Sequence, residues 1–228
     1  MTMRNSVLRP VMNLIHNLRH GRRIAAQKRT LLALPNRAMR RIVIGSSGTT
    51  LEGWVATDRE VVDLLREDSW LRYFGPAPLD AILAEHVWEH LSGEDALRSA
   101  QTCYRFLKPG GYVRAAVPDG LHPDPDYIAQ VRPGGCGAGA HDHKVLYDHA
   151  GFRDLFVRAG FEVRLYEYYD RDGRFHFNEW DPADGLIRRS MQFDERNSAR
   201  RLTYTSIILD AVKPAADSGS DSRPPARA

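Results

Sequence analysis

The segment from Gly134 to Lys144 is a flexible, glycine-rich stretch that ends in titratable side chains. It reads GGCGAGAHDHK and ends in four consecutive polar residues, His141, Asp142, His143 and Lys144. Imidazole and carboxylate groups can take up a proton from a substrate that reacts beside them. We therefore expect these four residues and Asp119 to be catalytic. The surrounding region 118–147 shows little helix or strand periodicity, which is typical of a lid or binding loop.

The same side chains support a second interpretation. His141 and His143 have His-x-His spacing, and with Asp142 and His122 they offer the ligands of a divalent metal. The spacing lacks the helical i, i+4 arrangement that is typical of zinc motifs. We therefore favour a role for these residues as a general base or in contact with the substrate, and we expect no bound metal. A metal-dependent hydrolase using the His141/His143 loop is kept as an alternative function.

Basic side chains farther along the chain offer a site for an anion. Arg188, Arg189 and Arg196 fall in another long irregular connection. Planar guanidinium groups bind carboxylates and phosphates through paired hydrogen bonds. We expect these three arginines to bind substrate, together with His122 and Asn197.

A glycine-containing turn and a later carboxylate suggest a nucleoside site. Gly45, Ser46, Ser47 and Gly48 follow the apolar run 41–44, and Asp58 lies 13 positions after Gly45. A turn that lets the backbone approach a ligand, followed by an acid for the ribose, is typical of nucleotide binding. The dinucleotide motif has a spacing of about 20 residues and a third glycine, so a pyrophosphate-binding dehydrogenase is disfavoured.

Strands and helices alternate along residues 37–213. Short β-branched runs predict buried strands, and a Ser92 N-cap starts an amphipathic helix that Pro109 stops. This alternation predicts an α/β fold: a Rossmann-like, doubly wound, mostly parallel sheet with an antiparallel C-terminal strand. The expected strands are 41–45, 54–57, 80–84, 112–117, 161–169 and 202–212, and the expected helices are 92–107 and 148–159.

Ligands of such sheets lie beyond the carboxyl ends of the strands. This rule selects the turn at 45–48, Asp58 and Asp119. It also selects Glu85 and His86, which directly follow the strand 80–84.

Length and charge divide the chain into three parts. Its 228 residues are 43% hydrophobic and 27% charged, which is ordinary globular composition. Residues 1–41 hold 10 of the 32 Lys and Arg and none of the 29 Asp and Glu, so the remainder is mildly acidic. We expect a basic amphipathic arm at 1–36, a catalytic domain at 37–213 and a disordered tail at 214–228, which has no large apolar residue.

The basic arm has several interpretations. Val7, Val11, Leu14 and Leu18 recur at helical spacing, with the regular helix expected to begin near Pro10. Its arginines favour a solvated face, with peripheral membrane contact through residues 4–29 as the main alternative. An organelle-targeting segment and nucleic acid are less favoured. Two cysteines, Cys103 and Cys136, and no run of 18 apolar residues indicate a cytoplasmic protein without a membrane span.

Five motifs occur in an order that resembles a known family. They are IVIGSSG (42–48), GWVATD (53–58), DAILAEHVWEHL (80–91), RFLKPGG (105–111) and AVPD (116–119). Over residues 40–213 the chain resembles class I S-adenosylmethionine-dependent methyltransferases, in particular a compact group of predicted methyltransferases of unknown acceptor. The pairing of EHVWEHL with LKPGGY and VPD carries the resemblance.

The resemblance implies a role for each matching position. Gly45 to Gly48 would bend around the methionine part of S-adenosylmethionine, and Asp58 would bind its ribose. Glu85 and His86 would border the sulfonium and the acceptor. For the acceptor, which the resemblance does not identify, we expect a small or glycan-like molecule. Ser47 departs from the usual Gly-x-Gly turn, so a non-catalytic methyltransferase-like subunit is a further alternative.

Overall fold

The computed structural model describes residues 4–34, 39–75 and 78–215, with side chains from residue 17 onward. Its centre is a seven-stranded sheet in the order β2-β1-β3-β4-β7-β5-β6. The strands are β1 (Arg41–Ile44), β2 (Val55–Ala56), β3 (Leu79–Glu85), β4 (Leu107–Pro118), β5 (Glu162–Tyr169), β6 (Phe175–Phe177) and β7 (Ser206–Val212). Neighbours from β2 to β4 are parallel, whereas β7 is antiparallel to both β4 and β5. The predicted fold class, with its antiparallel last strand, is confirmed.

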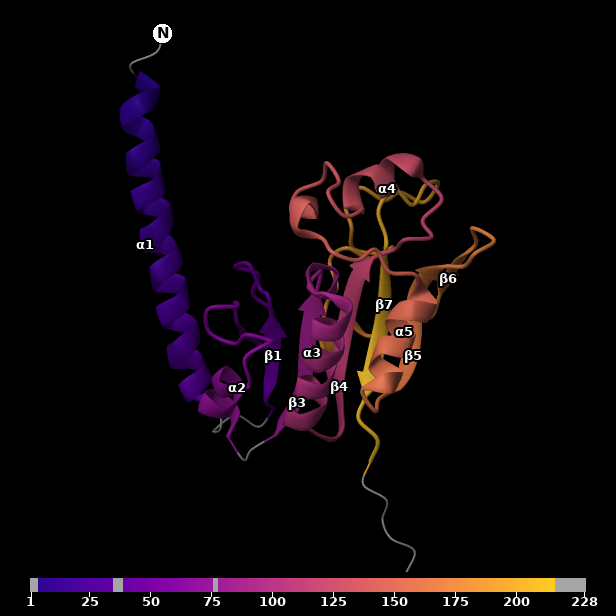
Figure 1. The fold of residues 1–228 in the computed structure, drawn as a ribbon, viewed down its shortest axis with the longest axis horizontal. Helices are drawn as coiled ribbons and strands as arrows, with labels where there is room; N and C mark the ends of the chain where they lie inside the picture. The colour runs from indigo at the N-terminus through magenta and orange to yellow at the C-terminus, as the bar shows by residue number, and fades with distance from the viewer. Residues whose placement is uncertain (1–3, 35–38, 76–77, 216–228) are drawn as a thin grey trace, which may run out of the picture.

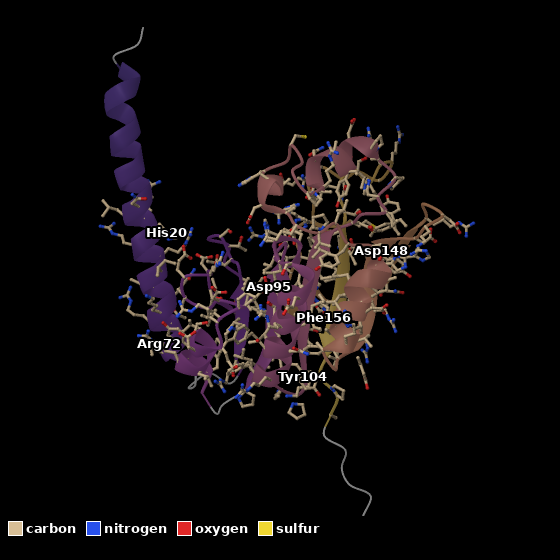
Figure 2. The ribbon with its side chains drawn as sticks, in the orientation of Figure 1. His20, Arg72, Asp95, Tyr104, Asp148 and Phe156 are labelled. Carbon is tan, nitrogen blue, oxygen red and sulfur yellow. The ribbon has the colours of Figure 1, made fainter. Side chains whose placement is uncertain are left out.

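Two helices cover one face of the sheet. In Figure 1, α3 (Gly93–Phe106) and α5 (His149–Arg158) lie side by side across β3, β4 and β7. Tyr104 of α3 and Phe156 of α5 are labelled on this face in Figure 2. The predicted cap is present, since Ser92 accepts a hydrogen bond from the backbone N–H of Asp95. Buried apolar residues beneath these helices, including Ile82 and Val113, form the main core.

The other face of the sheet is covered by an irregular segment that contains the short helix η4 (Pro182–Asp184). Arg114 of β4 holds this segment from inside the protein. Its guanidinium pairs with both carboxylate oxygens of Asp210, each at 2.8 Å, and donates to the backbone oxygens of Asp181 and Gly185 at 2.7 and 3.1 Å. The buried Arg114 therefore links the irregular segment to both β4 and β7.

The region above the carboxyl ends of the strands is more ordered than its sequence predicts. Within 118–147 the structure has the helix α4 (Pro125–Val131) and the short helix η3 (Ala140–Asp142). Both are too short to show a periodic pattern. Pro125 at the first helical position and Asp124, which accepts from the N–H of Asp126, are the local signals for α4. Figure 1 shows α4 above the ends of β4 and β7.

The basic arm is a helix, α1 (Arg4–Leu32), which runs past Pro10 rather than beginning there. Its N-terminal part extends away from the domain, whereas its C-terminal turns lie beside α2 (Glu67–Phe74), a helix that the sequence analysis missed (Figure 1). Leu31 is buried and Leu18 is 55% exposed. Figure 2 labels His20, whose Nε2 lies 3.0 Å from a carboxylate oxygen of Glu60.

The amphipathic stripe predicted for the arm is only partly visible. The side chains of Val7, Val11 and Leu14 lie outside the described residues, as does the tail from 216 onward. Among the helices that are described, none has the length and apolarity to cross a membrane.

We expect Arg114→Met to lower the free energy of unfolding by about 3–5 kcal/mol, because it leaves a buried, uncompensated carboxylate at Asp210. Urea unfolding measures this loss. The double variant Arg114→Met/Asp210→Leu should recover part of the stability, since it removes both charges. If Arg114→Met is as stable as the unmodified protein, the pairing of Arg114 with Asp210 does not stabilise the fold.

The buried carboxyl of Glu167 should make the stability of the protein depend on pH. Glu167 of β5 is fully buried, and its carboxylate accepts from the Trp180 indole at 3.1 Å and from the Met191 N–H at 2.7 Å. Burial nevertheless raises the pKa of Glu167 to about 7. Because the folded pKa is raised, the protonated group stabilises the fold fully below its unfolded pKa, near 4.5, and this contribution is lost as the pH rises towards 7.

We therefore expect the stability to fall between pH 5 and 8 by an amount, on the order of 2 kcal/mol, that Glu167→Gln abolishes. Urea unfolding at a series of pH values tests this. Glu162→Gln, an exposed position on the same strand, is the control and should keep the slope of the unmodified protein. Equal slopes for all three proteins would show that Glu167 is already ionised at low pH.

Candidate functional site

A cavity of about 590 Å³ opens at the carboxyl ends of β1 and β3. Its volume lies within the roughly 300–1,000 Å³ that is typical of small-molecule sites. Ile44 and Leu83 form its floor, and Val131 and Ala140, from α4 and η3, contribute its roof. The cavity therefore occupies the edge where ligands of parallel α/β sheets bind.

Five of the seven residues predicted to bind the cofactor line this cavity: Gly45, Ser46, Ser47, Glu85 and His86. The turn is tight, with positive φ at Gly45 (64°), Ser47 (48°) and Gly48 (91°). A Cβ at Gly45 would approach a Val87 side-chain carbon to 2.9 Å, so only glycine fits there. Ser47 adopts the left-handed conformation that the usual second glycine would adopt more easily.

The other two predicted cofactor residues, Gly48 and Asp58, do not line the cavity but face α1. The carboxylate of Asp58 accepts from the Ser46 hydroxyl and the Ser47 N–H, both at 2.8 Å. The Gln27 amide donates to its other oxygen at 3.0 Å.

Two further contacts join α1 to the turn. The backbone N–H of Asp58 donates to the side-chain oxygen of Gln27 at 2.9 Å. The Arg23 guanidinium lies 2.9 Å from the Asp58 carboxylate. Burial alone would raise the pKa of Asp58, but the hydrogen bonds from Ser46, Gln27 and Ser47 and the charge of Arg23 lower it. Asp58 is therefore ionised, only 6% exposed and held by the helix.

One wall of the cavity carries four titratable side chains from two segments. His86 and Glu89 follow β3, His90 ends the short helix η2 (Trp88–His90), and His143 follows η3. A ring nitrogen of His86 lies 3.3 Å from the Glu89 carboxylate, and one of His143 lies 4.0 Å from the same oxygen. His86 has a positive φ of 56°, which is rare for a residue with a side chain.

Burial sets the charge of this wall. It raises the pKa of the Glu89 carboxyl to about 8, and it holds the pKa of His86 well below the usual 6.5, with Arg189 contributing. Burial likewise lowers the pKa of His90, where the charge of His143 adds to the effect. At neutral pH His86 and His90 are therefore neutral.

Of the residues predicted to be catalytic, only His143 lines the cavity. His141, Asp142 and Lys144 are exposed, although an Asp142 oxygen lies 3.4 Å from Nδ1 of His90. Asp119 is fully buried, and its carboxylate accepts from the N–H groups of Tyr169 and Leu121. Asp119 therefore fixes the start of the loop instead of facing a ligand.

Among the predicted substrate residues, Arg188, Arg189 and Arg196 line the cavity. Arg196 is paired with Asp194 through two contacts, at 2.7 and 2.5 Å, and lies over the Tyr204 ring. Arg188 forms no ion pair with any described residue, and Arg189 is 3.9 Å from a Glu85 oxygen. Among the described residues, Arg188 is thus the unpaired cation of the cavity, and Arg189 is paired only at long range.

His122 and Asn197 do not line the cavity. His122 is 4% exposed and stacks on Tyr127. The amide of Asn197 donates to the backbone oxygens of Ser190, Met191 and Tyr204 and accepts from the N–H groups of Thr203 and Tyr204. Asn197 holds the loop that carries the arginines.

Glu89 and His90 line the cavity but were not among the predicted site residues. A signal exists, because the segment EHVWEH repeats a Glu-His pair four residues apart. That spacing places the second pair about one helical turn beyond the first, near the same strand end.

Comparison with known proteins agrees with this geometry. Residues 55–115, from β2 to β4, match the family model described as methyltransferase domain. No curated protein matches the chain.

Solved structures of similar fold include three methyltransferases or related proteins. One, from Archaeoglobus fulgidus, is an S-adenosylmethionine-dependent methyltransferase, 14% identical, covering 84% of this chain and 94% of its own, with a TM-score of 0.45. The methyltransferase SibL is 16% identical over 81% of this chain and 53% of its own, with a TM-score of 0.45. PigF, solved with S-adenosylhomocysteine (SAH), is 15% identical over 79% of this chain and 44% of its own, with a TM-score of 0.42.

The strand order is that of the predicted fold class, and residues 55–115 match a model of the methyltransferase domain, so the chain is similar in this segment to the methyltransferases that its motifs resemble.

Proposed function

We propose that this chain transfers the methyl group of S-adenosylmethionine to a small or glycan-like acceptor that carries an anionic group. One observation carries the proposal: a single cavity joins the turn at 45–47 to the titratable wall and the arginines. Donor and acceptor can therefore meet without crossing a barrier of protein.

The cofactor half of the cavity has the features that a nucleoside with an amino-acid tail needs. Backbone at Gly45 is exposed to the cavity without a side chain, and Glu85 and His86 border it at the next strand end. The cofactor, when bound, supplies an electrophilic methyl group. The residues of the chain then align the two partners and exclude water.

Asp58 is the proposed ribose ligand, and α1 competes for it. Its carboxylate lies directly behind Ser46 and Ser47, which line the cavity. Arg23 and Gln27 occupy the oxygen that the turn leaves free. Binding of the ribose hydroxyls by Asp58 would thus require at least one of these two side chains to move.

The acceptor half is formed by the wall and the arginines. The exposed guanidinium groups of Arg188 and Arg189 attract an anionic group of the acceptor. His143 also lines the cavity, and its side chain is only 7% exposed. We assign His143, with Glu89 and His90, to the reacting group of the acceptor.

Calorimetric titration with S-adenosylmethionine tests the cofactor half. We expect the unmodified protein to bind and Asp58→Ala to bind more weakly. Arg23→Ala should bind about fivefold more tightly, because it removes a half-exposed ion pair, worth roughly 1 kcal/mol, that competes with the ribose. Arg22→Ala, an exposed neighbour on α1, is the matched control and should not change the affinity.

Absence of binding by the unmodified protein at millimolar cofactor would favour the non-catalytic subunit. If Arg23→Ala and Asp58→Ala both bind like the unmodified protein, Asp58 serves the turn alone and the proposed ribose contact is wrong.

Transfer of a labelled methyl group tests the acceptor half. Incubated with cell extract and methyl-labelled cofactor, the unmodified protein should label a small product that an anion exchanger retains. His143→Ala should reduce labelling by about 100-fold while still binding the cofactor, since its side chain faces the acceptor. His176→Ala, on β6 outside the cavity, is the control and should label normally. A neutral labelled product would contradict the role given to Arg188 and Arg189.

A further inference from the structure

Three ligand-type side chains converge on the cavity wall. One carboxylate oxygen of Glu89 and one ring nitrogen each of His90 and His143 all lie within 4.8 Å of one another. Two of these residues come from η2 and the third from the segment after η3. Two imidazoles and one carboxylate form a donor set that proteins use for divalent transition metals.

The acceptors in this group have no donors. Glu89 is 1% exposed, and within the described part of the chain neither of its carboxylate oxygens has a hydrogen-bond partner. The Nδ1 of His90 is also buried and forms no hydrogen bond among these residues, although an Asp142 oxygen lies 3.4 Å away. Buried polar atoms are almost always satisfied, and an isolated buried carboxylate is costly. The group therefore requires a positive or proton-donating partner in the space between the side chains.

The hydrogen bond of His143 orients its free nitrogen. Its Nδ1 lies 2.7 Å from the backbone oxygen of Val131. A carbonyl oxygen can only accept, so Nδ1 carries the hydrogen and Nε2 of the neutral ring carries the lone pair. Nε2 is the atom on the Glu89 side, at 4.0 Å. A backbone carbonyl that fixes the tautomer in this way is the usual outer partner of a metal-binding histidine.

His86 supplies a second oriented nitrogen by the same logic. The Ser206 hydroxyl donates to the backbone oxygen of Arg189 at 2.7 Å, so it accepts from Nε2 of His86 at 2.9 Å. The lone pair of His86 is then on Nδ1, which lies 3.3 Å from the Glu89 oxygen. Two acceptors facing each other at this distance repel unless a cation or a shared proton lies beside them.

Backbone contacts hold the two segments together. The N–H groups of Lys144 and Val145 both donate to the backbone oxygen of Glu89, at 2.7 and 3.2 Å. These bonds fix the backbone next to His143 beside η2, and the bond from its Nδ1 to Val131 then orients the ring. The arrangement is thus determined by the fold and does not depend on a flexible loop finding its place.

We propose that Glu89, His90 and His143 bind one divalent transition-metal ion of the zinc type, with His86 beside it. The site shares only His143 with the loop cluster that the sequence suggested, because His141 is exposed and His122 is buried elsewhere. Binding of the ion does not depend on methyl transfer. Its position in the acceptor half of the cavity, however, rests on the proposed function.

Titration with Co²⁺ alone tests the site in the full-length protein after chelator treatment. We expect visible d–d absorption that saturates at one equivalent and is abolished by Zn²⁺. His143→Ala and the isosteric Glu89→Gln should each lower the affinity by more than the roughly 10–100-fold that loss of an outer partner causes. His141→Ala is the matched control, two positions away and exposed, and should bind like the unmodified protein.

A Cys136→Ser variant removes the one exposed free thiol among the described residues and should leave the Co²⁺ spectrum unchanged. Circular dichroism shows whether each variant is folded. No absorption in the folded, unmodified protein overturns the proposal and assigns the Glu89–His86 contact to a shared proton. Equal losses in His141→Ala and His143→Ala also overturn it.

The two proposals fail independently. Co²⁺ binding without cofactor binding would leave the metal site standing and remove the proposed function. Cofactor binding with no Co²⁺ spectrum would remove the metal site and leave the proposed function standing.

Discussion

The backbone oxygen of Glu89 accepts the N–H groups of both Lys144 and Val145, and the cavity depends on these two hydrogen bonds. They join the edge of the parallel sheet to a loop more than 50 positions later in the chain. The roof formed by α4 and η3 is held on its other side by Tyr127, whose hydroxyl donates to the backbone oxygen of Thr205 at 2.7 Å. Because backbone groups make the contact, the side chains of Glu89 and His143 are left free to face the ligand space.

Satisfaction of hydrogen bonds separates the scaffold from the site. Asp119 and Glu167 are both fully buried, and each carboxylate accepts hydrogen bonds from N–H groups of neighbouring segments. Glu89 is buried to the same degree, yet neither of its oxygens has a partner within the described residues. The scaffold thus accounts for the oxygens of Asp119 and Glu167 but not for those of Glu89, whose pKa burial raises to about 8.

The N-terminal helix contacts the side of the cavity that we propose for the nucleoside. Its Arg23 and Gln27 contact Asp58, the residue that the resemblance assigns to the ribose. The carboxylate also bonds to the turn at 46–47, so one side chain connects the helix, the turn and the end of β2. The basic arm therefore contacts a residue of the proposed cofactor site, which its charge pattern alone did not indicate.

Local patterns were sufficient for much of this protein. Continuous β-branched runs predicted the parallel strands because strands buried on both faces must be apolar along their length. The same patterns located the turn at Gly45 and placed Glu85 and His86 at the strand end, where the structure has them. The short helices α2 and α4 were not predicted, because one or two helical turns are too short to show a periodic hydrophobic pattern.

The direction of each side chain was decided only by the tertiary structure. His141 and His143 share one loop and one chemistry, yet one is exposed and the other faces the cavity, because the N–H groups that follow His143 are bound by Glu89. Asp58 faces α1 through a partner 31 positions away. Asn197, predicted to touch substrate, instead satisfies five backbone groups. Sequence spacing determines which residues reach the edge of the sheet, but contacts between distant segments determine which of them face the ligand.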